Sequence, residues 1–444
     1  MIQTKEGIRS NLLPQIVPKP WLSQTSSPIL LTNCLVVDPS TSSLLGNGQP
    51  QSILIKAGKI AAIGQIPTDL SEDVQTSDVG GRYVCPGLID SHVHCTAVPG
   101  GPSIADFVRT PEEIIAYRAP YVLDQMLKRG FTTVRDCGGA TKNLANALAE
   151  GLISGPRLIQ CGKALSQTGG HGDFVSGQSG GDRSATCCGG HSVSLGRVAD
   201  GVPAVLRAVR EELKAGADFI KIMCGGGVAS ETDAIETVQF SPEEVKAITS
   251  TCKQMGGKHT TAHAYTIEAI RHAIDNGVLG IEHGNLIDEA TAKLMAEKGV
   301  FLTPTLSVYD AFTQVPFDAM LNEDQHAKNL QVMEKGAQAI KIADAAGVTI
   351  CYGSDMLANM HPLQTKEFET RSSILPAATI LKHATINGAK MLRFEGKLGI
   401  VAEGAIADLI FLDQNPLEDI TILDRPDLHL LAVMQAGRWS INSF

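Results

Sequence analysis

The sequence lacks any long apolar stretch and any recognisable secretory leader. No run of about 18 apolar residues, the length that crosses a bilayer, occurs in its 444 residues, so we expect no membrane span. Residues 1–27 also lack a basic start followed by an apolar segment, and they contain three prolines. We interpret residues 1–27 as a surface arm.

Clustered positive charge is missing as well. The chain has 37 Lys and Arg against 47 Asp and Glu, a formal net charge of −10. Surfaces that bind nucleic acid or anionic lipid need clustered Lys and Arg, so neither is expected as the main partner. The ten cysteines do not read as a disulfide framework in a chain this long, because several lie in apolar runs where a free thiol packs well. We therefore expect a reduced, cytoplasmic protein.

The pattern of apolar runs along the sequence changes near Pro86 and again near Lys397. Short runs of β type occur on both sides of this middle part. They are Ile29–Val37, Gln51–Ile55, Lys59–Ile63, Ala407–Leu412 and Leu428–Met434. We predict that residues 28–85 and 398–444 together form a small composite β-sandwich domain.

The middle part, residues 86–397, alternates short apolar runs with amphipathic ones, a pattern typical of βα units and a parallel sheet. The candidate strands are Tyr83–Asp90, Thr132–Asp136, Arg157–Cys161, Phe219–Met223, His259–His263, Leu279–His283, Phe301–Pro304 and Val348–Tyr352. Eight strands close a TIM-type barrel, so we predict an α/β fold with a (β/α)8 barrel.

Two helices and one long connection stand out between these strands. Ser241 is predicted to cap a helix that ends near Gly256, with Pro242 in its first turn and Glu244 completing a capping box. A second helix is predicted from about Asn329 to Ala346. The connection Ala164–Ala199 is rich in Gly and Ser, and loops of this length are usually functional or disordered.

The pair His92-Val93-His94 is the first chemical signal. Alternate residues of a strand share a face, so both imidazoles can reach one metal ion. Asp90 has the same parity, and we predict that it orients a ligand histidine. A His-x-His pair by itself is weak evidence, but the C-terminal ends of barrel strands are where such folds keep their active sites.

Lys221 lies inside the apolar run Phe219–Met223, where a charged ammonium is costly to bury. Such a lysine can snorkel to the strand end or pair with a carboxylate. It can also lose its charge and react with CO2, giving an anionic carbamate able to bridge two metal ions.

Three further residues follow apolar strands. His263 and His283 end strands that are one βα unit apart, and Asp355 follows the last strand. An aspartate there can bind a metal and accept a proton from water, although Asp is also common in turns and helix caps. Each signal is modest, but together they predict a metal site at one end of the barrel.

The segment Pro86-Gly87-Leu88-Ile89-Asp90-Ser91-His92-Val93-His94 closely resembles the opening motif of the amidohydrolase superfamily. The segments Glu403–Leu409 and Asn415–Leu417 resemble its C-terminal part. Within the superfamily, residues 164–173 and 221–228 are similar to the branch that contains Xaa-Pro dipeptidases and ochratoxinase. Cys224 departs from the small residue expected there, and Cys187 and Cys188 lie where members of the branch differ.

This resemblance implies a role for each residue. His92 and His94 would bind the more buried ion, His263 and His283 the more exposed one, and Lys221, as its carbamate, would bridge both. Asp355 would contact the buried ion and act as general base. His171, in the long connection, would polarise the substrate carbonyl or bind a carboxylate, or serve only as a structural loop residue. Zinc suits these ligands best, and manganese or iron could replace it.

The reaction implied is amide hydrolysis of a small molecule. Water bridging two cations ionises near neutral pH and attacks the carbonyl, while Asp355 passes the proton to the leaving amine. Substrates would be N-acyl amino acids or dipeptides, with ochratoxin-type amides as a specific case, and the resemblance also implies a homo-oligomer.

Two other functions are alternatives for this sequence. Imidazolonepropionases, deaminases and related hydrolases of cyclic amides or esters use the same fold, but those with one metal need no lysine such as Lys221. A non-catalytic scaffold typically loses ligands, whereas all six positions are filled here.

Overall fold

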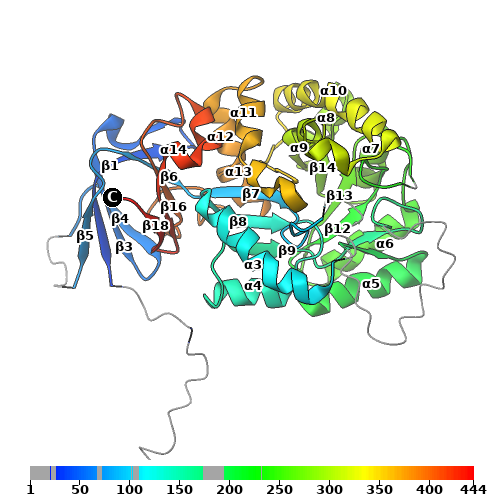
Figure 1. Cartoon of the computed structure of the whole chain (residues 1–444), viewed down its shortest axis with the longest axis horizontal. Helices are drawn as coiled ribbons and strands as arrows, with labels where there is room; N and C mark the ends of the chain where they lie inside the picture. The colour runs from blue at the N-terminus through cyan, green and yellow to red at the C-terminus, as the bar shows by residue number, and fades with distance from the viewer. Residues whose placement is uncertain are drawn as a thin grey trace, which may run out of the picture.

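The fold is organised around two systems of β-strands, one at each end of the molecule in Figure 1. The computed structural model describes residues 21, 27–67, 73–101, 103, 110–173, 195–231 and 233–444. Most of the predicted N-terminal arm and the pair Cys187-Cys188 lie outside these ranges. Among the described residues, no helix is both long enough and apolar enough to cross a bilayer.

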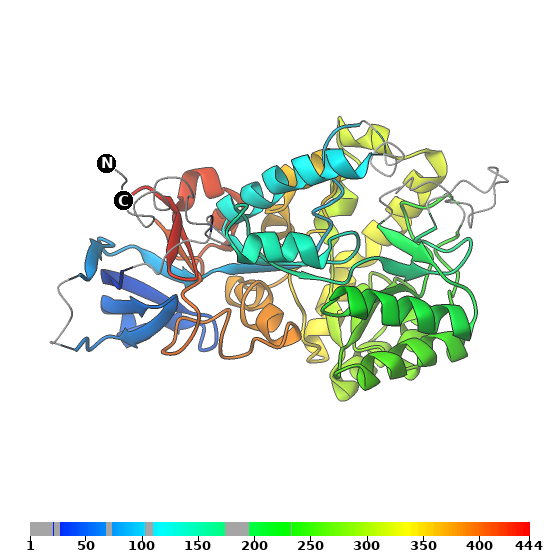
Figure 2. The ribbon, with the colours of Figure 1, turned by 90° about the horizontal axis from the view of Figure 1, so that it is seen from below.

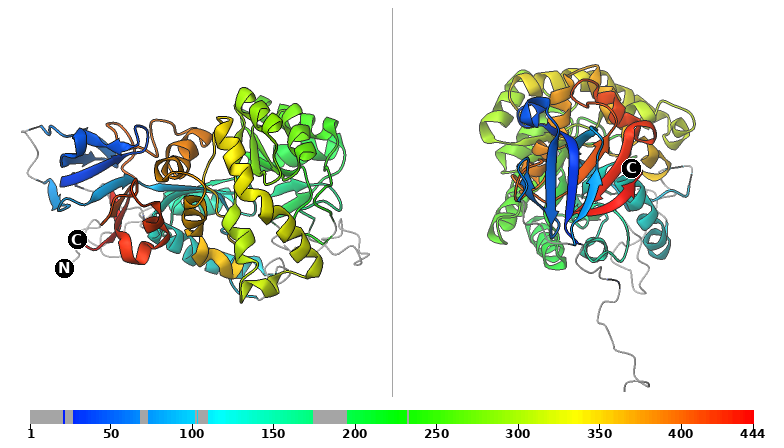
Figure 3. Two further views of the ribbon diagram at one scale, coloured as in Figure 1. Left: turned by 90° about the horizontal axis from the view of Figure 1, so that it is seen from above. Right: turned by 90° about the vertical axis from the view of Figure 1, so that its left-hand side faces the viewer.

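The first system is one nine-stranded sheet that contains strands from both ends of the chain. Its members are β1 (Ile29–Asp38), β2 (Ser43–Leu44), β3 (Gln51–Lys56), β4 (Lys59–Ile63), β5 (Gln75–Asp78), β6 (Tyr83–Pro86), β16 (Leu409–Leu412), β17 (Leu430–Gln435) and β18 (Arg438–Asn442). Figure 3 shows the blue and red strands side by side. This arrangement agrees with the composite domain expected from the sequence, whose exact boundaries stay a prediction.

The link between the two systems corrects one predicted strand. Tyr83–Asp90 is not a single barrel strand: β6 pairs with β1 and β16 in the composite sheet, and β7 (Leu88–Val93) begins the barrel. The break falls at Gly87, where an added Cβ would lie 2.2 Å from Thr132 Oγ1. A residue without a side chain lets the chain pass closely from one sheet to the other.

The second system is a ring of parallel segments. The strands are β7, β8 (Phe131–Asp136), β9 (Arg157–Gln160), β10 (Ala164–Ser166), β12 (Ile220–Met223), β13 (Thr260–Ala264), β14 (Gly280–His283) and β15 (Phe301–Thr303), and the short β11 (Gly196–Val198) pairs with β10 beside the ring. β9 pairs with β8, and β10, only a few residues further along the chain, pairs with β12. The third barrel strand is thus formed in two pieces, the second within the predicted long connection.

The predicted eighth strand, 348–352, is reduced to a single parallel bridge between Leu302 and Ile350. The Ser91 N–H also donates to the Tyr352 carbonyl at 2.8 Å, which joins this segment to β7. The ring therefore closes, as predicted for a (β/α)8 barrel.

Helices surround the ring between its strands, with the green pair α5 and α6 packed together outside it in Figure 2. They are α3 (Glu112–Lys128), α4 (Lys142–Ala149), α5 (Val202–Ala215), α6 (Pro242–Gln254), α7 (Ile267–Asp275), α8 (Glu289–Lys298), α9 (Leu306–Ala311), α10 (Glu323–Ala345), α11 (Lys366–Ser372), α12 (Ala377–His383) and α13 (Ile386–Met391). Short η1 (Leu45–Gly48), η2 (Phe317–Met320), η3 (Ala358–Leu363), η4 (Ile420–Asp424) and α14 (Pro426–His429) complete the fold.

The two predicted helices occur, one of them longer than expected. α6 has the predicted capping box between Ser241 and Glu244. α10 starts six residues before the predicted Asn329, because Asn322 and Gln325 form a capping box of their own. The sequence prediction considered Ser and Glu as capping residues, and Asn with Gln performs the same task.

Candidate metal centre

The six predicted ligands come together in one cavity. His92, His94, Lys221, His263, His283 and Asp355 all line it, and His171 from the long connection lines it too. They lie at the C-terminal ends of the barrel strands or just beyond them. Parallel strands bring their carboxyl ends to the same rim, which explains how residues up to 263 positions apart meet there.

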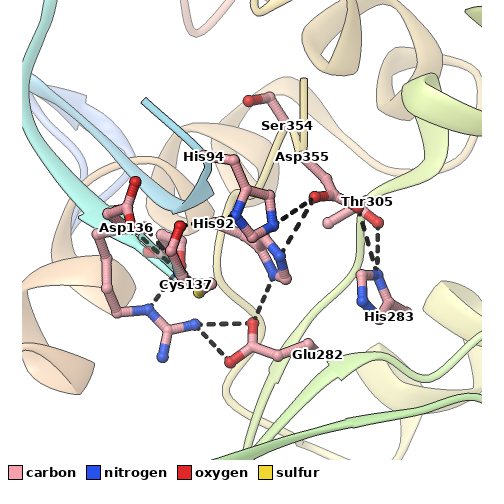
Figure 4. Close-up of polar contacts among 12 residues, drawn as sticks. His92, His94, Asp136, Cys137, Glu282, His283, Thr305, Ser354 and Asp355 are labelled. Carbon is pink, nitrogen blue, oxygen red and sulfur yellow. Dashed lines mark hydrogen bonds and ion pairs between the residues drawn. The ribbon is translucent and has the colours of Figure 1, made fainter. Parts of the chain in front are cut away.

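The inner part of the cavity is formed by His92, His94 and Asp355. The Nε2 atoms of both histidines lie 3.3 Å from Asp355 Oδ1, and Figure 4 shows both rings directed at this carboxylate. The three residues offer ligand atoms that lie within 4.8 Å of one another. Burial alone would raise the pKa of Asp355, but His92 and His94 hold it well below its ordinary range, so the side chain is a carboxylate.

Asp355 lies in a turn where its own backbone adopts a strained conformation. Its φ is +55°, and its N–H donates to the His92 carbonyl at 2.9 Å. Next to it, the Ser354 hydroxyl donates to Asp90 Oδ2 at 2.6 Å. Asp90 was expected to orient a histidine ring, and this expectation is wrong: it accepts bonds from the backbone N–H groups of His92 and Ser354, from the Ser354 hydroxyl and from Gln364.

Glu282 contacts the His92 ring instead, a role that the sequence analysis missed. Glu282 Oε2 lies 2.9 Å from His92 Nδ1, and both Glu282 oxygens accept hydrogen bonds from Arg135 at 2.6 and 2.7 Å. Burial would raise the pKa of Glu282, but Arg135 and His92 hold it well below its usual range. A glutamate inside the apolar strand Gly280–His283 was the available signal, since such a charge needs a partner.

Lys221 points into the same cavity from β12 and is 2% exposed. It forms no hydrogen bond or ion pair with any residue that the structure describes. The snorkelling and ion-paired alternatives for this lysine therefore do not apply among those residues. Burying an ammonium without a polar partner is costly, so a lysine in this position calls for a functional explanation.

The outer part of the cavity holds His263 and His283, whose ring centroids lie 4.6 Å apart. His263 Nε2 lies 3.0 Å from the Gly226 carbonyl. His283 Nδ1 lies 2.8 Å from Thr305 Oγ1 and 3.1 Å from the Tyr309 hydroxyl. Burial lowers the pKa of both rings well below the ordinary value, so each is neutral and has a nitrogen lone pair to offer.

His171 stacks on His263 at 4.1 Å between ring centroids. Its Nδ1 lies 2.8 Å from Ser230 Oγ, and Ser230 in turn donates to Asp233. An added Cβ at Gly227 would come within 2.0 Å of the His171 ring, so only glycine leaves room for this placement. His171 is thus held at the cavity by the loop after β12.

Tyr265 and Tyr309 also line the cavity, and the sequence analysis missed both. Their hydroxyl groups lie 2.9 Å apart, and both side chains are buried. Tyr265 directly follows β13, two positions after His263, so strand parity extended by one residue was a usable signal. Tyr309 lies on α9, and no local pattern distinguishes it from a core residue. Cys224, by contrast, packs in the hydrophobic core beside β12 and does not line the cavity.

The donor set fits divalent metal ions. Neutral imidazole nitrogens, a carboxylate and a lysine able to gain a carboxyl group are ligands that zinc and similar cations accept. Hydrogen bonds to one ring nitrogen fix the orientation of the His92, His263 and His283 imidazoles, as is usual for metal-binding histidines.

The sequence matches the amidohydrolase family over residues 83–439, which is most of the chain. The chain belongs to the amidohydrolase family. Members of this family use divalent metal ions, in keeping with the residues gathered in the cavity. The barrel and the flanking β-sheet are those of the family, which confirms the predicted fold.

The chain is also similar to individual amidohydrolases in sequence and structure. Ochratoxinase from Aspergillus niger is 31% identical over 402 residues, which cover 86% of this chain and 82% of the relative. A prolidase solved with N-methylphosphonate-L-proline is 41% identical with a TM-score of 0.87, covering 93% of this chain and 99% of that one. A Xaa-Pro dipeptidase solved with methionine is 31% identical with a TM-score of 0.80, with the same coverage. This amidohydrolase is therefore a hydrolase of amide bonds, as predicted.

Proposed function

We propose that this amidohydrolase is a binuclear metal-dependent enzyme that cleaves the amide bond of N-acyl amino acids or dipeptides. The observation that carries the proposal is that all six expected ligands and His171 line one cavity. The similarity to a prolidase, a Xaa-Pro dipeptidase and ochratoxinase supports this substrate class. Ochratoxin A is a specific candidate within it.

The proposed metal site divides between the two parts of the cavity. His92 and His94 would hold the inner ion together with Asp355, and His263 and His283 would hold the outer one. Lys221, as its carbamate, would contribute one oxygen to each ion. Its free buried amine and the apolar surroundings of β12 support this assignment. Zinc is the proposed metal, since imidazole and carboxylate-type oxygen both suit it.

The metal ions would supply an acidified water molecule and polarise the scissile carbonyl. Asp355, a carboxylate at the edge of the cavity, would accept the proton of this water and pass it to the leaving amine. Ser230, which donates to Asp233, engages Nδ1 of His171, so the other ring nitrogen would be the one available to the substrate. We assign to His171 a contact with the substrate carbonyl or carboxylate.

The experiment that tests this function is a hydrolysis screen with metal analysis on the same sample. We expect release of an amino acid from N-acyl amino acids or Xaa-Pro dipeptides, with about two zinc ions per chain. Ochratoxin A belongs in the same screen. No hydrolysis of any of these amides would contradict the substrate class.

Metal content also distinguishes the alternative function from the proposed one. A stable content of one ion per chain, with turnover of a cyclic amide or an aminated ring, would favour an imidazolonepropionase-like or deaminase-like enzyme. Lys221 in the cavity weighs against that outcome, because a one-metal site has no use for a bridging ligand. Assembly into a homo-oligomer and a cytoplasmic location stay predictions.

A further inference from the structure

An ion pair is enclosed in the barrel directly behind the inner part of the metal cavity. Arg135 comes from β8 and Glu282 from β14, and their side chains are 0% and 1% exposed. The Arg135 Nε–H donates to the Ser91 carbonyl on β7 at 2.5 Å, and its guanidinium lies 4.9 Å from the centre of the Phe219 ring. Arg135 is therefore fixed from several sides and cannot turn away from Glu282.

A buried ion pair of this kind needs an explanation other than stability. Removing two charges from water costs about as much as their attraction returns, and apolar replacements are often equally stable. Arg135 even leaves its second terminal nitrogen, Nη1, without a hydrogen-bond partner among the described residues. The role of the ion pair therefore lies in its contacts with other groups, and Glu282 contacts the His92 ring.

The contact decides which nitrogen of His92 faces the cavity. Glu282 accepts two hydrogen bonds from Arg135 and, as a carboxylate, can only accept one from His92 as well. The proton of a neutral His92 ring must then lie on Nδ1. When a metal ion is bound, the lone pair offered to it is then the one on Nε2, the atom that lies 3.3 Å from Asp355 Oδ1.

Arg135 has a second effect on Glu282. His92, Cys137 and Glu282 offer ligand atoms within 4.8 Å of one another, so without Arg135 they form a candidate cation site of their own. The guanidinium engages both Glu282 oxygens and supplies the positive charge that a cation would bring. A metal ion is thereby directed to the Nε2 side of His92.

We propose that Glu282, held by Arg135, is a positioning residue that sets the zinc affinity of the inner site by fixing the Nδ1–H tautomer of His92. This inference rests on the proposed function, because it requires an ion bound at His92. Groups that hydrogen-bond a metal-binding histidine typically change metal affinity about 10- to 100-fold when replaced.

The test is a zinc titration of metal-free protein in competition with a coloured chelator, comparing wild type with Glu282→Gln. The glutamine amide must turn its NH2 group toward either His92 Nδ1 or Arg135, so one contact becomes repulsive in each orientation. We expect zinc affinity at the inner site to fall about 10- to 100-fold. The visible spectrum of the cobalt-loaded protein should change with it, because the ligand geometry changes.

The chain contains a matched control. Glu367 and Arg371 form another Glu–Arg pair, with both side chains 0% exposed and 2.7 Å between Oε1 and Nε, and neither contacts any of the six proposed ligands. Glu367→Gln should lower the thermal stability and leave zinc affinity and the cobalt spectrum unchanged. Equal losses of affinity in both variants, or wild-type affinity in Glu282→Gln, would overturn the inference.

A milder pair of variants covers the case in which Glu282→Gln does not fold. Arg135→Lys keeps the charge but loses the planar guanidinium, whose Nε–H donates to the Ser91 carbonyl while Nη2 donates to both Glu282 oxygens. Arg371→Lys is its control. The same rule applies: a loss of zinc affinity confined to Arg135→Lys supports the inference, and equal behaviour overturns it. Wild-type protein that takes up no zinc would overturn the proposed metal site and the inference together, whereas zinc-binding wild type with an unchanged variant overturns the inference alone.

Discussion

The inner and outer parts of the metal cavity are built differently. Of the two inner histidines, His94 has only the Gly138 carbonyl behind it, at 3.4 Å, but behind His92 lies a carboxylate paired with a guanidinium inside the barrel. Behind the outer histidines lie neutral groups on loops and a short helix: the Gly226 carbonyl, the Thr305 hydroxyl and the Tyr309 hydroxyl. Hydrogen bonds to charged groups are stronger than those to neutral ones, so we expect the inner ion to be bound more tightly and the outer one to exchange more readily.

Lys221→Ala removes the one residue that both parts are proposed to share, and we expect the largest effect from it. Both ions should be lost and hydrolysis should fall to the level of the metal-free protein. Metal analysis and amide hydrolysis measure this, and a short carboxylic acid added to the variant should restore part of both. Retention of two ions with normal turnover would show that Lys221 is not a bridging ligand.

Asp355→Asn tests the inner part alone. The amide keeps the size of the side chain but cannot take up a proton, so hydrolysis should fall about 10²- to 10⁴-fold. Thermal unfolding should show a folded protein, because the turn is held by the Asp355 N–H and by Ser354 rather than by the carboxylate. Near-normal turnover would remove the assigned role as general base.

Thr305→Val tests the outer part. The variant keeps the shape of the side chain and removes the hydroxyl that lies 2.8 Å from His283 Nδ1. A stepwise zinc titration should show the weaker binding constant reduced about tenfold and the stronger one unchanged. Equal changes in both constants would contradict the division of the cavity into two independently supported parts.

Ser230→Ala should give the smallest effect. It removes the hydroxyl between His171 and Asp233, and with it the hydrogen bond to the His171 ring, which is worth about 1 kcal/mol, or about fivefold. We expect a rise in KM of this size with metal content unchanged, since His171 is proposed to contact the substrate. A change in metal content instead would place His171 among the ligands.

The fold and the proposed ligands could be predicted because their signals are local. A histidine or aspartate directly after an apolar strand is visible within a few residues, and parallel strands bring all such ends to one rim. The same reasoning missed the break between two strands at Gly87. The chain passes there from one sheet to the other, and this depends on the close contact between Gly87 and Thr132.

The sequence by itself determined which proposed metal ligands face the cavity, because strand period and strand order follow from the apolar pattern. Only the tertiary structure decided which groups hydrogen-bond to these ligands on the side away from the cavity. Arg135 and Glu282 are 147 positions apart, and His92 and Glu282 are 190 apart. No local pattern encodes such a pairing: it arises when the ring closes and encloses both charges, which must then find each other in the absence of water.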